Sequence, residues 1–352
     1  MSIAATPSAV AGVRLRAARP LLVACGLGLL VAGLSVSHLG FGARAIPAST
    51  VVRALLAFDA DSFDHNVIVE LRLLRLLAAL AVGAGLGLTG ALIQSVTRNP
   101  LGEPHVLGLN AGGALAVVST LTLSPLLGGG LPASALAAAR PLVAGLGATL
   151  LCALVLAAAS LGRTGLTPLK VTLCGVAFSA FAAALTSAQL LLDDQTLATV
   201  RLWLAGDLSG LSYGALWAAL PPAAVGLGLA LVLARRLDAL AMGDQVAAGL
   251  GIDVARTRLA ALVSAGLLCG AAVSLAGPIG FVGLVVPHAV KALGVRDMRL
   301  VLPLSALAGA ALLVAADLAA RSLFAPRELA TGIVTALVGV PVFIALASRR
   351  RP

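Results

Sequence analysis

Arginine and aspartate side chains are the residues whose types and spacing could support recognition chemistry. Arg72 and Arg75 lie three residues apart at the expected start of an apolar helix, so they share one helix face. Basic residues oppose the dipole at a helix N-terminus, which indicates that they serve another purpose there. Planar guanidinium groups suit two-point binding of carboxylates, so the pair fits an acidic partner. Asp317 and Arg321, four residues apart, predict a local ion pair.

Motifs for hydrolytic or covalent chemistry are absent from the sequence. Both lysines, Lys170 and Lys291, follow an apolar residue, so neither belongs to a G-x-x-x-x-G-K-[ST] phosphate loop. No H-E-x-x-H zinc motif and no G-x-S-x-G nucleophile motif occurs. The four cysteines are scattered through apolar stretches and are expected to be small buried hydrophobic residues. We therefore expect no catalytic residues, no metal site and no cofactor.

The elements that position the arginines are apolar. Of the 352 residues, 60% are hydrophobic and only 11% are charged, whereas soluble domains average roughly 25% charged residues. Too few charges remain to cover a surface in water, so the surface must face lipid. This excludes soluble and disordered proteins. Despite the net charge of +10, aromatic residues make up only 3%, which argues against nucleic-acid binding.

Charge-free runs predict the membrane spans, because a spanning helix needs about 20 apolar residues. Glycine pairs spaced four apart, such as Gly83 and Gly87, indicate close helix packing. The run 104–139 contains Ser124-Pro125 and a glycine-rich stretch, which predict one helix followed by an external loop. The runs are 20–43, 76–97, 104–139, 141–162, 171–192, 208–234, 259–290, 300–316 and 329–348.

The distribution of basic residues decides how the long run 259–290 is divided. It contains Gly277-Pro278 and Gly280, and could form one broken pass or two passes. With two passes the chain has ten spans, and 16 of its 24 lysines and arginines lie on the side of both termini. With one pass each side holds 12, and the usual cytoplasmic excess of basic residues disappears. We therefore predict ten spans with the N- and C-termini in the cytoplasm.

The first apolar run has a second interpretation as a signal peptide. Basic residues precede it, and Ala43-Arg44-Ala45 resembles a weak cleavage site. The run is longer than the apolar core of a usual signal peptide, which has about 7–15 residues. We therefore expect a retained first helix.

The longest predicted cytoplasmic loop, 235–258, could meet a partner. Residues 239–248 have a helix-forming composition, and Gly249 and Gly251 mark its end. A short helix across the end of the bundle would suit docking, but a solvated linker fits the same residues.

Several motifs resemble those of one transporter family. The sequence is similar to the FecCD-type permeases of bacterial type II ABC importers for iron-siderophore complexes and vitamin B12, over roughly residues 40 to 350. The motifs include Leu71-Arg-Leu-Leu-Arg-Leu-Leu77, Arg98-Asn-Pro-Leu-Gly-Glu-Pro-His105, Leu240-Ala-Met-Gly-Asp244, Gly277-Pro-Ile-Gly-Phe-Val-Gly283, Ala316-Asp-Leu-Ala-Ala-Arg321 and Glu328-Leu-Ala-Thr-Gly332.

The resemblance implies an all-α membrane protein, a BtuC-like bundle of about ten transmembrane helices whose pathway forms in a dimer. The implied divisions are a cytoplasmic N-terminal segment 1–19, a transmembrane domain 20–348 containing the coupling loop 235–258, and a cytoplasmic tail 349–352. Implied partners are two cytoplasmic ABC ATPase subunits, a substrate-binding protein and a second permease subunit, identical or different. The implied location is the bacterial inner membrane.

The resemblance also implies roles for residues at matching positions. Arg72, Arg75 and Arg321 match arginines that dock the binding protein, although Leu74 stands where the family usually has proline. The implied ATPase-coupling residues are Leu240, Met242, Gly243, Asp244, Ala248, Gly249 and Gly251. The implied helix break along the pathway involves Gly277, Pro278, Gly280 and Gly283.

The resemblance implies a non-catalytic permease subunit that moves a ferric siderophore inward while a partner hydrolyses ATP. Haem or cobalamin is the alternative cargo. An ion-coupled secondary transporter and a membrane assembly protein without a pathway are alternative classes. An ion-coupled carrier usually needs buried carboxylates, and Asp317 is the clearest candidate within the predicted spans.

Overall fold

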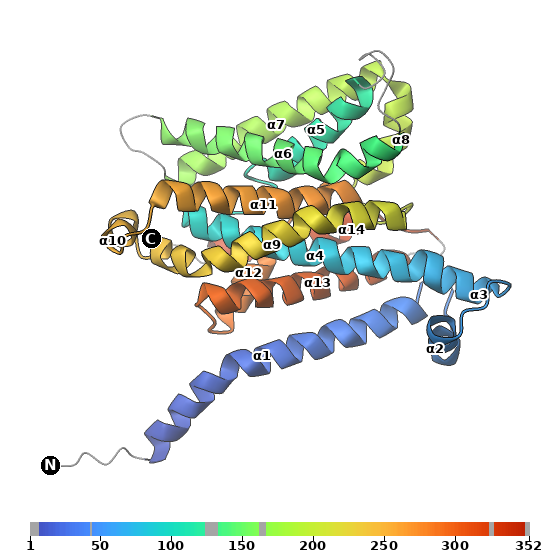
Figure 1. The fold of residues 1–352 in the computed structure, drawn as a ribbon, viewed down its shortest axis with the longest axis horizontal. Helices are drawn as coiled ribbons and strands as arrows, with labels where there is room; N and C mark the ends of the chain where they lie inside the picture. Colours follow the sequence, from blue (N-terminus) through green and yellow to red (C-terminus); the bar gives the residue numbers. More distant parts are fainter. Residues whose placement is uncertain (1–6, 43, 124–132, 162–166, 324–326, 349–352) are drawn as a thin grey trace.

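The computed structural model describes residues 7–42, 44–123, 133–161, 167–323 and 327–348. These residues form a bundle of α-helices, and no β-strand occurs among them (Figure 1). The predicted external loop at 124–132, the tail 349–352 and Ala43 of the possible cleavage site lie outside the described residues.

Among the described residues, ten helices make up the body of the bundle, and shorter elements connect them. The body consists of α1 (Pro7–Gly40), α4 (Leu74–Thr97), α5 (Leu109–Leu123), α6 (Ala133–Ser160), α7 (Pro168–Leu192), α9 (Tyr213–Ala241), α11 (Val254–Ala276), α12 (Val282–Ala292), α13 (Met298–Ser322) and α14 (Thr331–Ser348). The shorter elements are α2 (Ala48–Leu56), α3 (Phe63–Asn66), the π-helical turn η1 (Val67–Leu73), α8 (Asp194–Leu204) and α10 (Asp244–Gly249).

The lengths of these helices agree with the predicted number of spans. Seven helical segments of the described chain are long and apolar enough to cross a membrane, and α5, α12 and α14 are shorter apolar helices. Together they give ten membrane-embedded elements. The prediction of an all-α protein with about ten spans is confirmed.

The long run 259–290 is divided as the two-pass interpretation predicted. Helix α11 ends at Ala276, and Gly277 follows with φ 69° and ψ −169°, a conformation essentially restricted to glycine. A Cβ on Gly277 would lie 1.8 Å from the Trp203 carbonyl oxygen, so close backbone contact also requires glycine there. Pro278 cannot donate a helical hydrogen bond, and the chain turns back into α12 at Val282.

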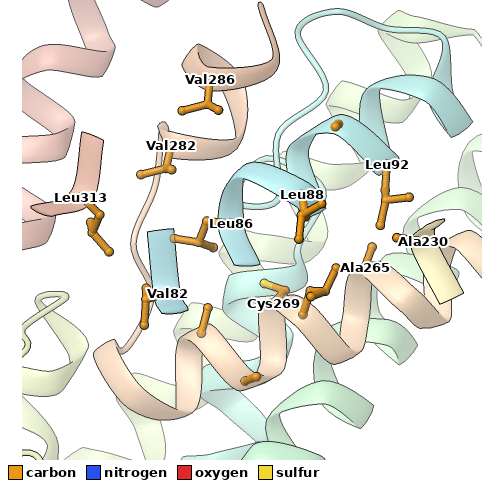
Figure 2. Packing of buried hydrophobic residues seen from close by; sticks show 14 of the residues in the cluster. Val82, Leu86, Leu88, Leu92, Ala230, Ala265, Cys269, Val282, Val286 and Leu313 are labelled. Carbon is orange, nitrogen blue, oxygen red and sulfur yellow. The ribbon is translucent and has the colours of Figure 1, made fainter. Parts of the chain in front are cut away.

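Helix α4 lies in the middle of the bundle and packs against α9, α11, α12 and α13. Figure 2 shows side chains of α4, such as Leu86 and Leu92, among apolar side chains of these neighbours. A Cβ added to Gly83 would lie 2.4 Å from the Gly309 carbonyl oxygen on α13. One added to Gly87 would lie 2.2 Å from that of Ser305. The predicted close helix packing at this glycine pair is confirmed.

The bundle has two ends that carry different connecting elements (Figure 1). The beginning of α1 and the short helix α10 lie at one end, called the α10 end below. Helices α2 and α3 lie at the other end, called the α3 end. The two predicted contact sites for partners lie at these opposite ends.

Candidate functional site

The two arginines predicted at a helix start lie inside a longer helix. Helix α3 begins at Phe63 and continues through η1 into α4 without a break. Leu74 donates its backbone N–H to the Leu71 carbonyl, a bond that a proline could not make. The prediction that Arg72 and Arg75 oppose a helix N-terminus is therefore wrong, because the helix extends through a segment whose charged residues interrupt the charge-free run at Leu76.

Arg72 closes the end of helix α1. Its Nη1 donates to the carbonyl oxygens of Leu39 and Gly40 at 2.7 and 2.9 Å, and its Nη2 donates to that of Arg44 at 2.5 Å. The last carbonyl groups of a helix lack partners within the helix, and a cation there complements the helix dipole. Arg72 is buried, and both of its terminal nitrogens already donate to carbonyl groups of the same chain.

Arg75 binds two carboxylates from distant parts of the sequence. Its Nε donates to both oxygens of Asp317 at 3.0 and 3.1 Å, and its Nη2 lies 2.9 Å from Oδ1 of Asp317. Its Nη1 donates to Oε2 of Glu328 at 2.8 Å. A more distant carboxylate, Asp207, lies 3.8 Å from Nη2.

Asp317 is the centre of this arrangement and is fully buried. Arg321 Nε lies 3.3 Å from Asp317 Oδ2, which confirms the predicted ion pair four residues apart on α13. His38 Nε2 lies 2.8 Å from the same oxygen, and the Thr331 hydroxyl donates to Oδ1 at 2.8 Å. Asp317 therefore joins α1, α4, α13 and α14 at the α3 end. These residues, with Arg72, Arg75 and Glu328, are called the α3-end cluster below.

A cavity of about 320 Å³ opens beside the α3-end cluster. All three predicted docking arginines line it, together with Glu70, Glu328 and the stretch 208–211. The structure thus brings Arg72, Arg75 and Arg321 together, as one docking site requires. Each of them also has partners within the chain; the sequence indicated the partner of Arg321 but not those of Arg72 and Arg75.

The α10 end holds the predicted coupling residues in a different form from the expected one. A continuous helix over 239–248 is wrong, because α9 ends at Ala241 and α10 begins at Asp244. Gly243 separates them with φ 123° and ψ 153°, again a conformation essentially restricted to glycine. The short helix is therefore Asp244–Gly249, and it turns away from α9.

Asp244 anchors α10 to the bundle through two arginines. Arg98 and Arg258 both donate to Asp244 Oδ1, the latter at 2.9 Å. Arg98 Nε also donates to the Leu240 carbonyl at 2.8 Å. Burial lowers the pKa of Arg98, and the nearby positive charge of Arg258 lowers it further.

Apolar side chains of the α10 segment face outward. Met242 at the end of α9, Val246 on α10 and Leu250 at the end of α10 are all exposed. This set is called the apolar knob below. Of the other predicted coupling residues, Ala248, Gly249 and Gly251 are exposed, and Leu240 is buried beneath them. The combination of an exposed apolar knob and an anchored base can contact a partner and transmit its movement.

The residues of the predicted helix break pack against a second motif, which lies in the connection between α4 and α5. A Cβ on Gly283 would lie 2.6 Å from Pro104 Cδ, so the α4–α5 connection lies directly against α12. Glu103, a buried carboxylate that the sequence reasoning missed, accepts the backbone N–H of Phe281 at 2.5 Å. The contact of Gly283 indicates a packing role, whereas Gly280 is half-buried and faces Glu103.

Comparison with known proteins agrees with this arrangement. Residues 29–349 match the FecCD transport family. The chain belongs to this family. As a FecCD protein, it is a multi-pass membrane protein and a permease of the ABC importer type.

Curated FecCD relatives are similar over most of their length. The Fe(3+) dicitrate transport system permease protein FecD of Escherichia coli (strain K12) is 41% identical over 92% of this chain and 97% of its own. The probable siderophore transport system permease protein YfiZ of Bacillus subtilis (strain 168) is 38% identical over 85% and 87%. The cobalamin import system permease protein BtuC of Halobacterium salinarum is 37% identical over 86% and 79%.

A solved structure has the same fold. It is described as an inward-facing conformation of a metal-chelate type ABC transporter, with a TM-score of 0.75 and 28% sequence identity. The similarity covers 94% of this FecCD chain and all of the other. The fold prediction of a permease bundle is confirmed.

Proposed function

We propose that the chain is the membrane-spanning subunit of an ABC importer that moves a ferric siderophore into the cytoplasm of a bacterium. The observation that carries the proposal is its full-length similarity to permeases named for siderophore and ferric citrate transport. The sequence contains no phosphate-binding loop, so energy must come from partner subunits. In this scheme two ATPases lie at the α10 end, and a second permease, identical or different, completes the pathway.

The orientation follows from the same scheme. The α10 end faces the cytoplasm with both termini, and the α3 end faces the binding protein in the periplasm or outside the cell. The excess of basic residues on the side of α10 supports this orientation. The α3-end arginines would receive carboxylates of the substrate-binding protein, and the apolar knob would sit in the ATPase.

Reconstitution tests the proposal directly. The permease is placed in lipid nanodiscs with its ATPase, and ATP hydrolysis is measured with binding proteins of the source organism. Each is loaded with a ferric siderophore, ferric citrate, haem or cobalamin. We expect ferric-siderophore-loaded protein to give the largest stimulation. Stimulation by none of them, or uptake that continues without ATPase and stops with an uncoupler, would reject the scheme.

Cobalamin is the second candidate cargo, because the Halobacterium salinarum relative named for cobalamin import is 37% identical. This identity is close to the 38% and 41% of the iron-chelate permeases above. Preferential stimulation by cobalamin-loaded binding protein would assign the chain to that cargo.

A further inference from the structure

The two carboxylates on Arg75 differ sharply in exposure. The side chain of Asp317 is fully buried, whereas that of Glu328 is 41% exposed. Both lie within 3 Å of the guanidinium group, at different nitrogen atoms. Breaking a buried pair is strongly unfavourable, but an exposed pair contributes little and exchanges easily. Arg75 thus has one permanent partner and one that can be replaced.

The other two arginines of the cluster have no comparable exposed partner. Arg72 uses both terminal nitrogens on backbone carbonyl groups. Arg321 is paired with buried Asp317 and donates to the His38 carbonyl at 3.2 Å. Within the described residues, the bond between Arg75 and Glu328 is therefore the contact of the cluster that a foreign carboxylate could most easily take.

The cavity gives such a carboxylate access. Arg75 and Glu328 both line the opening of about 320 Å³ at the α3 end. Glu328 lies in the connection between α13 and α14, three residues before Thr331, whose hydroxyl is bound to Asp317. If Glu328 left Arg75, the connection would lose this contact, while Thr331, the first residue of α14, would stay bound to Asp317.

We propose that Glu328 is an internal competitor for the docking carboxylate. It occupies Nη1 of Arg75 in the free permease, and an Asp or Glu of the substrate-binding protein replaces it on docking. Asp317 remains in place and keeps Arg75 oriented. The proposal rests on the proposed function, because it names the atom at which the binding protein would engage.

Binding affinity tests the competition. Glu328→Gln removes the competing charge with little change in shape, so the chelate-loaded binding protein that stimulates ATP hydrolysis should bind about two- to five-fold more tightly. The matched control is Glu70→Gln, which removes a carboxylate of the same cavity that is not bonded to Arg75. Its affinity should change less. In an Arg75→Gln background, the gain from Glu328→Gln should disappear.

A chemical probe tests the same contact without the partner. Phenylglyoxal modifies accessible arginines, and mass spectrometry of the full-length permease in nanodiscs gives the rate at Arg75. We expect Glu328→Gln to raise this rate several-fold and Glu70→Gln to leave it unchanged.

The outcomes separate the two proposals. The competition alone would be overturned if Glu328→Gln weakened docking, or if Glu328→Gln and Glu70→Gln changed the affinity equally. It would also be overturned if Glu328→Gln docked the binding protein normally but left the labelling rate of Arg75 unchanged. If no binding protein docks on the native permease, the proposed function fails and the competitor role fails with it, whatever the labelling shows.

Discussion

Asp317 at the α3 end and Asp244 at the α10 end each receive two arginine side chains. Asp317 is fully buried and also binds a histidine and a threonine. The side chain of Asp244 is 45% exposed and lines a cavity. The same ionic chemistry therefore has different consequences: at the α3 end it joins four long helices, whereas at the α10 end it attaches one short helix that stays accessible. The two residues are of the same type, and their exposure distinguishes Asp317, which holds the bundle together, from Asp244, whose helix can adjust.

Removing the buried charge should have the largest effect. Asp317→Asn leaves Arg75 and Arg321 without their shared counter-charge in a buried site. We expect a loss of about 3–5 kcal/mol in the free energy of unfolding. Thermal unfolding of the purified permease in detergent measures it. Stability equal to that of the native chain would show that the buried cluster does not hold the bundle.

Two glycines with similar backbone conformations sharpen the comparison. Gly277 and Gly243 both have positive φ, but a Cβ on Gly277 meets the Trp203 carbonyl, whereas one on Gly243 meets nothing within 4 Å. Alanine is strained at both positions, and only Gly277→Ala adds overpacking, which costs about 1–3 kcal/mol. Gly277→Ala should therefore unfold at lower temperature than Gly243→Ala, and the reverse order would contradict the packing at the break.

The apolar knob tests whether the α10 end serves a partner. Replacing Val246 and Leu250 by serine removes exposed apolar surface, so folding should be nearly unaffected. We expect coupled transport to fall about ten-fold, since interface anchors of this kind contribute about 1–2 kcal/mol. ATP-driven uptake in proteoliposomes measures the change. A matched control is Leu293→Ser, another exposed apolar residue, outside the α10 segment. Equal losses in both variants would argue against a specific knob.

A much smaller stability change than at Asp317 is expected at the exposed aspartate. Asp244→Asn weakens a partly solvated ion pair, and such pairs contribute under about 1 kcal/mol. Thermal unfolding beside Asp317→Asn gives the contrast. Similar losses in the two variants would remove the distinction between the two ends.

The sequence predicted the body of the fold well because span length and glycine spacing are local properties. Nine apolar runs, one of them divided in two at Gly277-Pro278, predicted the ten embedded helices of the described chain. The partner of Arg75 could not be predicted in this way, because Asp317 lies 242 residues away and only the packing of α4 on α13 brings them together. The ion pair with Arg321 was predictable, since four residues on one helix fix its geometry.

Predictions about other parts of the site were wrong or incomplete for identifiable reasons. The charge-free run began at Leu76, so the part of the helix from Phe63 that carries charged residues was missed. Composition favoured a continuous helix over 239–248, but the backbone freedom of Gly243 allowed the break. Glu103 carried no local signal beyond its position in a motif, because its partner is the backbone N–H of Phe281, just before α12.

The π-helical turn at Val67–Leu73 sets the rotation of α3 about the axis of α4. A π-turn accommodates one residue more than an α-turn, and each residue of an α-helix advances the chain by about 100° around the axis. Deleting one residue from this turn would swing α3 around α4 by about a quarter of a revolution. Arg75 and Asp317 lie after the deletion and would keep their contact. The segment that contains α2 and α3 would lose its alignment with the last turn of α1. The one additional residue in this turn thus determines the direction in which α3 projects from the bundle.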